Sequence, residues 1–121
     1  MLLGIDKDGI ATLLVTNNAF HNITGYKTDT VGKNVYEFVD ASKHKFLGRQ
    51  FEKILNFKQP IEFTIWAKVP IGRRAFEVEM IPVLTRKKEI KEIIVMVRDI
   101  TALIKLQEEV RTLRAASYNA P

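Results

Sequence analysis

The chain has 121 residues, of which 46% are hydrophobic, and this length and apolar content are those of one small globular domain. It contains no cysteine, which excludes disulfides, thiolate catalysis, zinc fingers and cysteine-based photochemistry, and we expect a cytoplasmic protein. No apolar run approaches the roughly 20 residues that cross a bilayer, so we expect no membrane partner. The net charge is +5, and the basic clusters at 73–74 and 86–88 are typical of solvated turns, so we expect no direct contact with nucleic acid.

The first predicted elements are two short strands joined by a tight turn. Residues 1–6 and 10–16 are the two apolar runs. The intervening "DKDG" is typical of a turn, with Gly9 at a position that favours positive φ. Together they predict a β-hairpin.

A polar segment with scattered apolar residues follows. Thr16 or Asn17 can cap a short helix, and Gly25 is placed to end it. A second helical turn, "KTDTVG", ends at Gly32. Such short helices are unstable alone, so both must pack on a larger element, which we take to be the sheet. We expect the first helix to turn three apolar side chains inward: Ala19, Phe20 and Ile23.

Residues 40–57 are predicted to form a long helix in the middle of the chain. Asp40 or Ser42 can cap it, and Gln59 with Pro60 ends it. Four apolar residues recur at helical spacing and form one stripe: Leu47, Phe51, Ile54 and Leu55.

Three further strands are predicted over 61–68, 76–81 and 93–97. The first two alternate apolar and polar residues, whereas the last is apolar on both sides, which is typical of a strand covered on both faces. Its inward residues are Ile93, Val95 and Val97, and its outward residues are Ile94 and Met96. The order of the predicted elements favours an α+β fold with helices on one face of an antiparallel sheet. This order is two strands, a helical block, three strands and a terminal helix.

The last strand passes into the terminal helix with only residues 98–101 between the two patterns. We divide the chain into a domain at 1–101, a helix at 102–116 and the start of a linker at 117–121. Four residues of the helix make a heptad seam: Leu103, Leu106, Val110 and Leu113. This seam predicts a two-chain coiled coil. The alternative is a helix that folds back onto its own sheet and covers Ile94 and Met96.

Several motifs, taken in order, resemble the PAS domain family. The hairpin with "DKDG" is followed by "NNAF", then "ITGY" at 23–26 and "VGK" at 31–33, and "VRDIT" at 97–101 resembles the closing motif of the family. The resemblance covers the chain up to Thr101. We expect the motif residues to have structural roles at helix ends and turns: Asn17, Gly25, Tyr26, Gly32, Asp99 and Thr101.

This resemblance implies a PAS-like fold with a five-stranded antiparallel sheet in the order 2-1-5-4-3. It also implies a ligand site between the sheet and the long helix. The residues that would line this pocket are Phe20, Phe38, Phe46, Leu47, Phe51, Phe63, Phe76, Val78 and Val95. The alternative is a closed, dry core, because nine large side chains can fill a small interior.

The sequence does not identify a cofactor, and we expect none. The missing cysteine excludes covalent flavin photochemistry. His44 resembles the placement of the haem ligand in oxygen-sensing PAS domains, so haem is an alternative, as is another small molecule. His21 and His44 are both expected to be exposed, and no cluster of residues suits a metal ion or catalysis.

The family resemblance further implies a sensory or dimerisation role within a larger bacterial signalling protein. We expect a non-enzymatic homodimer that joins through the outer face of the sheet and the terminal helix and passes a signal to an output domain of the same chain. "DITALIKLQEEVRTLR" is similar to sequences that precede the ATPase domain of sigma-54-dependent transcriptional activators. A sensor histidine kinase of a two-component system is the alternative output, and a constitutive dimerisation domain without ligand is the alternative role.

Overall fold

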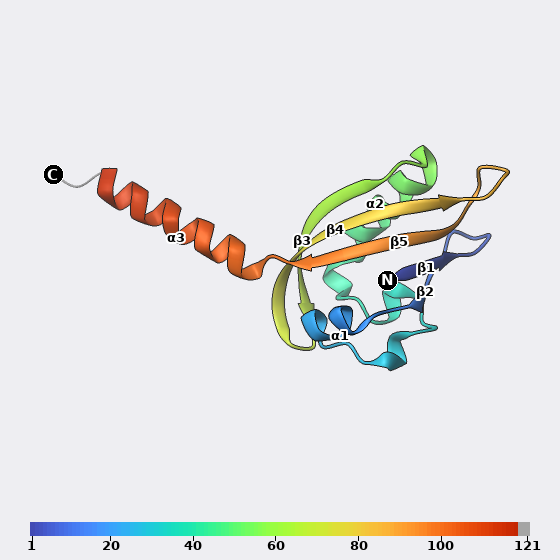
Figure 1. Ribbon diagram of the computed structural model, residues 1–121, viewed down its shortest axis with the longest axis horizontal. Helices are drawn as coiled ribbons and strands as arrows, with labels where there is room; N and C mark the ends of the chain where they lie inside the picture. Colours follow the sequence, from blue (N-terminus) through green and yellow to red (C-terminus); the bar gives the residue numbers. More distant parts are fainter. Residues whose placement is uncertain (119–121) are drawn as a thin grey trace.

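The computed structural model describes residues 1–118. Five strands form one antiparallel sheet in the order β2-β1-β5-β4-β3, which confirms the predicted order (Figure 1). The strands are β1 (Leu2–Ile5), β2 (Ala11–Val15), β3 (Ile61–Val69), β4 (Gly72–Leu84) and β5 (Ile90–Asp99). The helices are α1 (Asn18–Thr24), α2 (His44–Phe57) and α3 (Thr101–Tyr118), with the 3₁₀ turns η1 (Thr28–Thr30), η2 (Val35–Glu37) and η3 (Ala41–Lys43).

Strands β4 and β5 are longer than the sequence pattern predicts. Their ladder runs from the pair Phe76–Asp99 to the pair Leu84–Ile90. Charged residues in these stretches break the apolar pattern, but their side chains point to solvent while the backbone pairing continues. The two long strands therefore extend the sheet at both ends beyond the apolar residues at its centre.

The helical segment packs on the inner face of this sheet and closes one core. The largest fully buried side chains come from four elements: Leu3, Leu13, Ile54 and Ile93. Helix α2 turns its predicted stripe inward, with Leu55 only half-buried, but it begins at His44 rather than at residue 40. The side chain of Asp40 accepts a hydrogen bond from the Ser42 nitrogen and caps the 3₁₀ turn η3, not α2 as predicted. Lys58 ends α2 with a φ of 55°, and its Nζ donates to the Lys88 carbonyl at 2.7 Å.

Helix α1 corrects one prediction. The side chain of Asn17 accepts from the Phe20 nitrogen and Gly25 ends the helix at φ 79°, as predicted, but Ala19 is exposed. A helix of seven residues can bury only one narrow face, and that face belongs to Phe20 and Thr24, four positions apart. Ala19 lies about 100° around the helix from Phe20 and therefore faces solvent.

Helix α3 extends away from the sheet instead of folding back onto it (Figure 1). Ile94 and Met96 stay 41% and 50% exposed, so the fold-back alternative is wrong. Only Ile100 separates the end of β5 from Thr101 at the start of α3, which confirms the predicted direct passage from strand to helix. The helix continues to Tyr118, into the expected linker, of which residues 119–121 lie outside the described residues.

Candidate functional site

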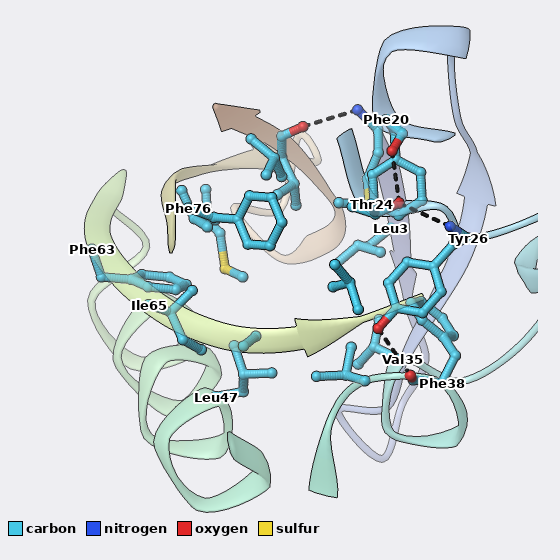
Figure 2. A pocket seen from close by; sticks show the side chains of 18 of the residues that line it. Leu3, Phe20, Thr24, Tyr26, Val35, Phe38, Leu47, Phe63, Ile65 and Phe76 are labelled. Carbon is cyan, nitrogen blue, oxygen red and sulfur yellow. Dashed lines mark hydrogen bonds between the residues drawn. The ribbon is translucent and has the colours of Figure 1, made fainter. Parts of the chain in front are cut away.

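A cavity of about 120 Å³ lies between the inner face of the sheet and the helical segment (Figure 2). In Figure 2, Phe20 and Tyr26 stand on one side of this space and Phe63 and Ile65 on the other. Eight of the nine predicted pocket residues line the cavity: Phe20, Phe38, Leu47, Phe51, Phe63, Phe76, Val78 and Val95. Their side chains leave this space open between them rather than filling it.

Phe46 is the ninth predicted pocket residue, and the structure places it outside the lining. Its ring meets that of Phe63 edge to face, with the ring centroids 5.4 Å apart. Phe46 immediately precedes Leu47 on α2, and neighbouring residues of a helix point in directions about 100° apart. It therefore supports the wall from behind while Leu47 faces the cavity.

Other lining residues were not predicted. Ile65 and Met80 occupy inward positions of their strands, and the period of two in the sequence could have identified them. Met1, Thr24 and Tyr26 carried no such signal, because chain segments far apart in sequence bring them to the cavity.

The polar groups at the cavity wall are already hydrogen-bonded. Thr24 Oγ1 donates to the Phe20 carbonyl at 2.7 Å and accepts from the Tyr26 nitrogen at 3.1 Å. The Tyr26 hydroxyl donates to the Phe38 carbonyl at 3.1 Å. Burial, and then the negative charge of Asp40, raise the pKa of the Tyr26 hydroxyl, which keeps it a neutral donor. The cavity therefore offers an apolar surface to a guest.

The size of the cavity decides which guests fit. Pockets for drug-sized ligands measure roughly 300–1,000 Å³, whereas an apolar cavity of about 150 Å³ in another protein binds benzene or xenon. At about 120 Å³, this cavity matches a guest of one small ring. A haem or a flavin does not fit it.

His44 lies apart from the cavity lining. Its Nε2 is 3.0 Å from the Val39 carbonyl, and its ring meets that of Tyr36 edge to face. The carbonyl can only accept, so Nε2 carries a proton and is not free to bind iron. His44 is half-buried rather than exposed. The residues present therefore do not form a haem site around His44.

His21 is also half-buried and bonded, which corrects the expectation that it is exposed. Nδ1 lies 2.6 Å from the Tyr26 carbonyl, and Nε2 lies 2.7 Å from Thr16 Oγ1. Because a carbonyl only accepts, Nδ1 donates to it, while Nε2 is hydrogen-bonded to the Thr16 hydroxyl. The ring thus joins the chain segments before and after α1 and fixes the helix that carries Phe20.

A second group of contacts joins β5 to α3, and we call it the strand–helix joint. The Ile100 nitrogen donates to the Ala75 carbonyl, and the Ala75 nitrogen donates to Thr101 Oγ1, each at 2.9 Å. Thr101 Oγ1 donates to Asp99 Oδ1 at 2.6 Å, and the Thr101 nitrogen donates to the same oxygen at 2.9 Å. The start of α3 is therefore bonded to β4 as well as continuous with β5.

The charge on Asp99 is part of this joint. Partial burial alone would raise the pKa of the Asp99 carboxyl. The two hydrogen bonds from Thr101 and the positive charge of Arg74 outweigh that effect, so the pKa lies below its usual value. The carboxylate is consequently ionised at neutral pH and accepts both bonds from Thr101.

The sequence fits one family over most of its length. A family model described as "PAS domain" matches residues 1–102. The chain belongs to the PAS domain family. PAS domains are generally sensory modules without catalytic activity. This chain has the sheet order that the resemblance implied and the terminal helix that its heptad pattern predicted.

Solved PAS structures agree with the fold. A PAS domain from Colwellia psychrerythraea is 14% identical, with a TM-score of 0.67 over 84% of this chain and 86% of that one. A sensory box histidine kinase/response regulator from Burkholderia thailandensis E264 is 13% identical, with a TM-score of 0.65 over 98% and 90%. A sensory box sensor histidine kinase from Vibrio cholerae is 21% identical, with a TM-score of 0.61 over 83% and 80%. No curated protein matches the chain.

The outer face of the PAS sheet is partly apolar. Leu14, Ile94 and Met96 are each at least 41% exposed there. Leu14 lies over Gly4, where a Cβ would stand 2.9 Å from the Leu14 Cδ1 atom. Farther along, Arg98 and Glu77 form an exposed ion pair at 3.2 Å. Among residues 1–118, no helix combines the length and apolar character of a membrane span.

Proposed function

We propose that this PAS domain senses a small apolar ligand in the cavity and passes the signal through α3 to an output domain of the same chain. The observation that carries the proposal is the position of β5. This strand supplies Val95 and Val97 to the cavity wall and Asp99 to the strand–helix joint.

Strand β4 supports the same coupling. Phe76 lines the cavity, and its neighbour Ala75 bonds both Ile100 and Thr101. Phe76 is one position from Ala75 and Val97 is two positions from Asp99, so a guest that moves either side chain acts close to the bonds that hold the start of α3. Because tightly packed interiors change between discrete arrangements, a small displacement there can alter the direction of the helix.

We further propose that a second copy of this chain is the partner. The four seam residues of α3 are 38% to 69% exposed. In a parallel coiled coil they would meet their counterparts, and the apolar outer face around Ile94 and Met96 would approach the partner's sheet. Two heptads are marginal in isolation, so the sheet contact would contribute part of the dimer's stability.

For the output, we propose a transcriptional activator of the sigma-54-dependent type, from the wording of the sequence after "DIT". A sensor histidine kinase is the second candidate, and the sensory box kinases among the solved neighbours favour it. Assaying the complete protein for ATPase activity and for autophosphorylation on histidine separates the two outputs.

Crosslinking tests the coupling directly. Leu103→Cys and Leu106→Cys, each made in the otherwise cysteine-free chain, should form disulfide-linked dimers, and saturation with fluorobenzene should change their relative yields. Lys105→Cys, on a different face of the helix, is the matched control and should crosslink weakly. Dimers that form equally from all three positions, with or without fluorobenzene, would contradict the proposed transmission.

A constitutive dimerisation module is the alternative role. It is favoured by the bonded polar groups of the cavity wall, since such a core can remain stable without a guest. In that case native mass spectrometry shows a dimer without ligand, and fluorobenzene changes neither its stability nor the crosslinking pattern.

A further inference from the structure

A surface notch lies next to the cavity, between α1 and the outer half of β5. It measures about 180 Å³. Six of the side chains around it are Met1, Asn17, Ala19, Phe20, Met96 and Val97. Ala19 and Asn17 are exposed, so the notch is open to solvent.

The notch and the cavity share part of their walls. Met1, Phe20 and Val97 line both spaces. Phe20 is 7% exposed and stands at the edge of the cavity in Figure 2. The notch and the cavity are therefore contiguous at these three side chains.

One of these three side chains is easily moved. The backbone of Met1 is held by two hydrogen bonds to Val95, at 2.9 Å from its amino group and 2.8 Å to its carbonyl. Its side chain, however, has three rotatable bonds and is intrinsically flexible, whereas the branched Val97 has one preferred conformer. The Met1 side chain can therefore change its conformation without breaking a backbone hydrogen bond.

Other walls of the cavity are more costly to open. On the sheet side they are strands held in continuous ladders, as between β3 and β4. On the opposite side, α2 contributes Leu47 and Phe51 from a 14-residue helix with one buried stripe. Separating either wall breaks several hydrogen bonds or exposes much of the core.

We propose that small apolar guests reach the cavity through this notch, past the side chains of Met1 and Phe20. This inference rests on the proposed ligand function of the cavity. It gives Ala19 the role of keeping the entrance open. A larger side chain at this position would obstruct the passage from outside without touching the bound guest.

The test uses fluorobenzene as the probe, with fluorine NMR reporting both its affinity and its rate of exchange with the purified protein. Ala19→Trp should slow association and dissociation alike by about tenfold or more, equivalent to raising the barrier by about 1.4 kcal/mol, and leave the dissociation constant unchanged. The smaller variant Ala19→Leu should give an intermediate slowing. Asn22→Trp, another exposed position of α1 outside both lining sets, is the matched control and should exchange as the unsubstituted protein does.

The outcomes separate the route from the ligand function. Binding to the unsubstituted protein with unaltered exchange in Ala19→Trp overturns the route alone. Equal slowing in Ala19→Trp and Asn22→Trp also overturns it, because the effect then follows from α1 as a whole. Failure of fluorobenzene to bind the unsubstituted protein overturns the ligand function and the route together.

Discussion

The Ala75 nitrogen on β4 donates a 2.9 Å hydrogen bond to the Thr101 hydroxyl at the first position of α3. Both residues are buried, Ala75 completely and Thr101 to within 3% exposure. The helix is thereby attached to a strand that is 26 positions away in the sequence and also borders the cavity.

Replacing Thr101 with valine should loosen this attachment. Valine keeps the shape of the side chain but leaves the buried Ala75 nitrogen without its acceptor, which costs about 1–3 kcal/mol of unfolding free energy. Urea denaturation measures the loss, and hydrogen exchange should show faster opening in the first turn of α3. Thr112→Val is the control, because Thr112 is exposed and its hydroxyl bonds only within α3; an equal loss in both variants would contradict the role given to Thr101.

Acid should weaken the joint through Asp99. Its pKa in the folded protein lies below the usual 3.8, because the bonds from Thr101 and the charge of Arg74 outweigh the opposing effect of burial. Folding therefore favours the carboxylate: its stabilisation is complete above the pKa of the unfolded chain and is lost as the pH falls through the lower folded value. Asp40, whose pKa is lowered by hydrogen bonds from Lys68 and Ser42, acts in the same direction.

Comparing Asp99→Asn with the unsubstituted chain isolates this contribution. Unfolding free energies measured between pH 2 and pH 6 should fall less steeply in the variant toward the acid end. Asp29→Asn, at an exposed position in η1, should retain the original slope. The same acid dependence in Asp99→Asn and the unsubstituted chain would show that Asp99 does not contribute.

Partial filling of the cavity should stabilise the domain and remove the site. Ala67 lies on β3, is 8% exposed and lines the cavity. Ala67→Val adds two methyl groups toward the open space and should raise the unfolding free energy by about 0.5–2 kcal/mol while weakening fluorobenzene binding. Thr64→Val, on the exposed side of the same strand, controls for strand preference; destabilisation by Ala67→Val would mean that the space cannot accept the added volume.

Two glycines with positive φ offer a matched test of the contact between α1 and the β3–β4 turn. A Cβ on Gly25 would stand 2.6 Å from Ile71 Cγ2, whereas a Cβ on Gly32 would meet nothing within 4 Å. Gly25→Ala and Gly32→Ala share a similar backbone strain, so Gly25→Ala should be the more destabilising by about 1–3 kcal/mol. Thermal or urea unfolding gives the difference, and equal losses would show that the turn yields freely.

Local features were the most predictable from the sequence. The cap at Asn17 and the bonds between Asp99 and Thr101 depend on residues two or three positions apart, and short polar side chains bond neighbouring backbone in few ways. The sheet order followed from a family resemblance together with the alternating strands. The bonding of His21 depends on a carbonyl that the fold brings back to it, and no local pattern contains that information.

Features that depend on volume or on a missing partner were less predictable. Whether Phe46 or Met1 borders a cavity depends on side-chain positions to within about an ångström, and composition does not determine these. The heptad pattern of α3 identified an apolar seam, but the same pattern suits contact with the chain's own sheet and contact with another chain. The extended course of α3 excludes contact with the chain's own sheet, and contact with another chain stays a prediction.

The single residue between β5 and α3 also has a geometric consequence. Because only Ile100 separates β5 from α3, the orientation of the sheet determines the direction in which each side chain of α3 points. Successive side chains along the helix differ in direction by about 100°. Lengthening the helix by seven residues would return whatever follows it to within about 20° of its original angular setting, whereas two residues would turn it by about 160°. The orientation of the sheet therefore determines the rotational setting of any segment that continues from α3 as a rigid helix.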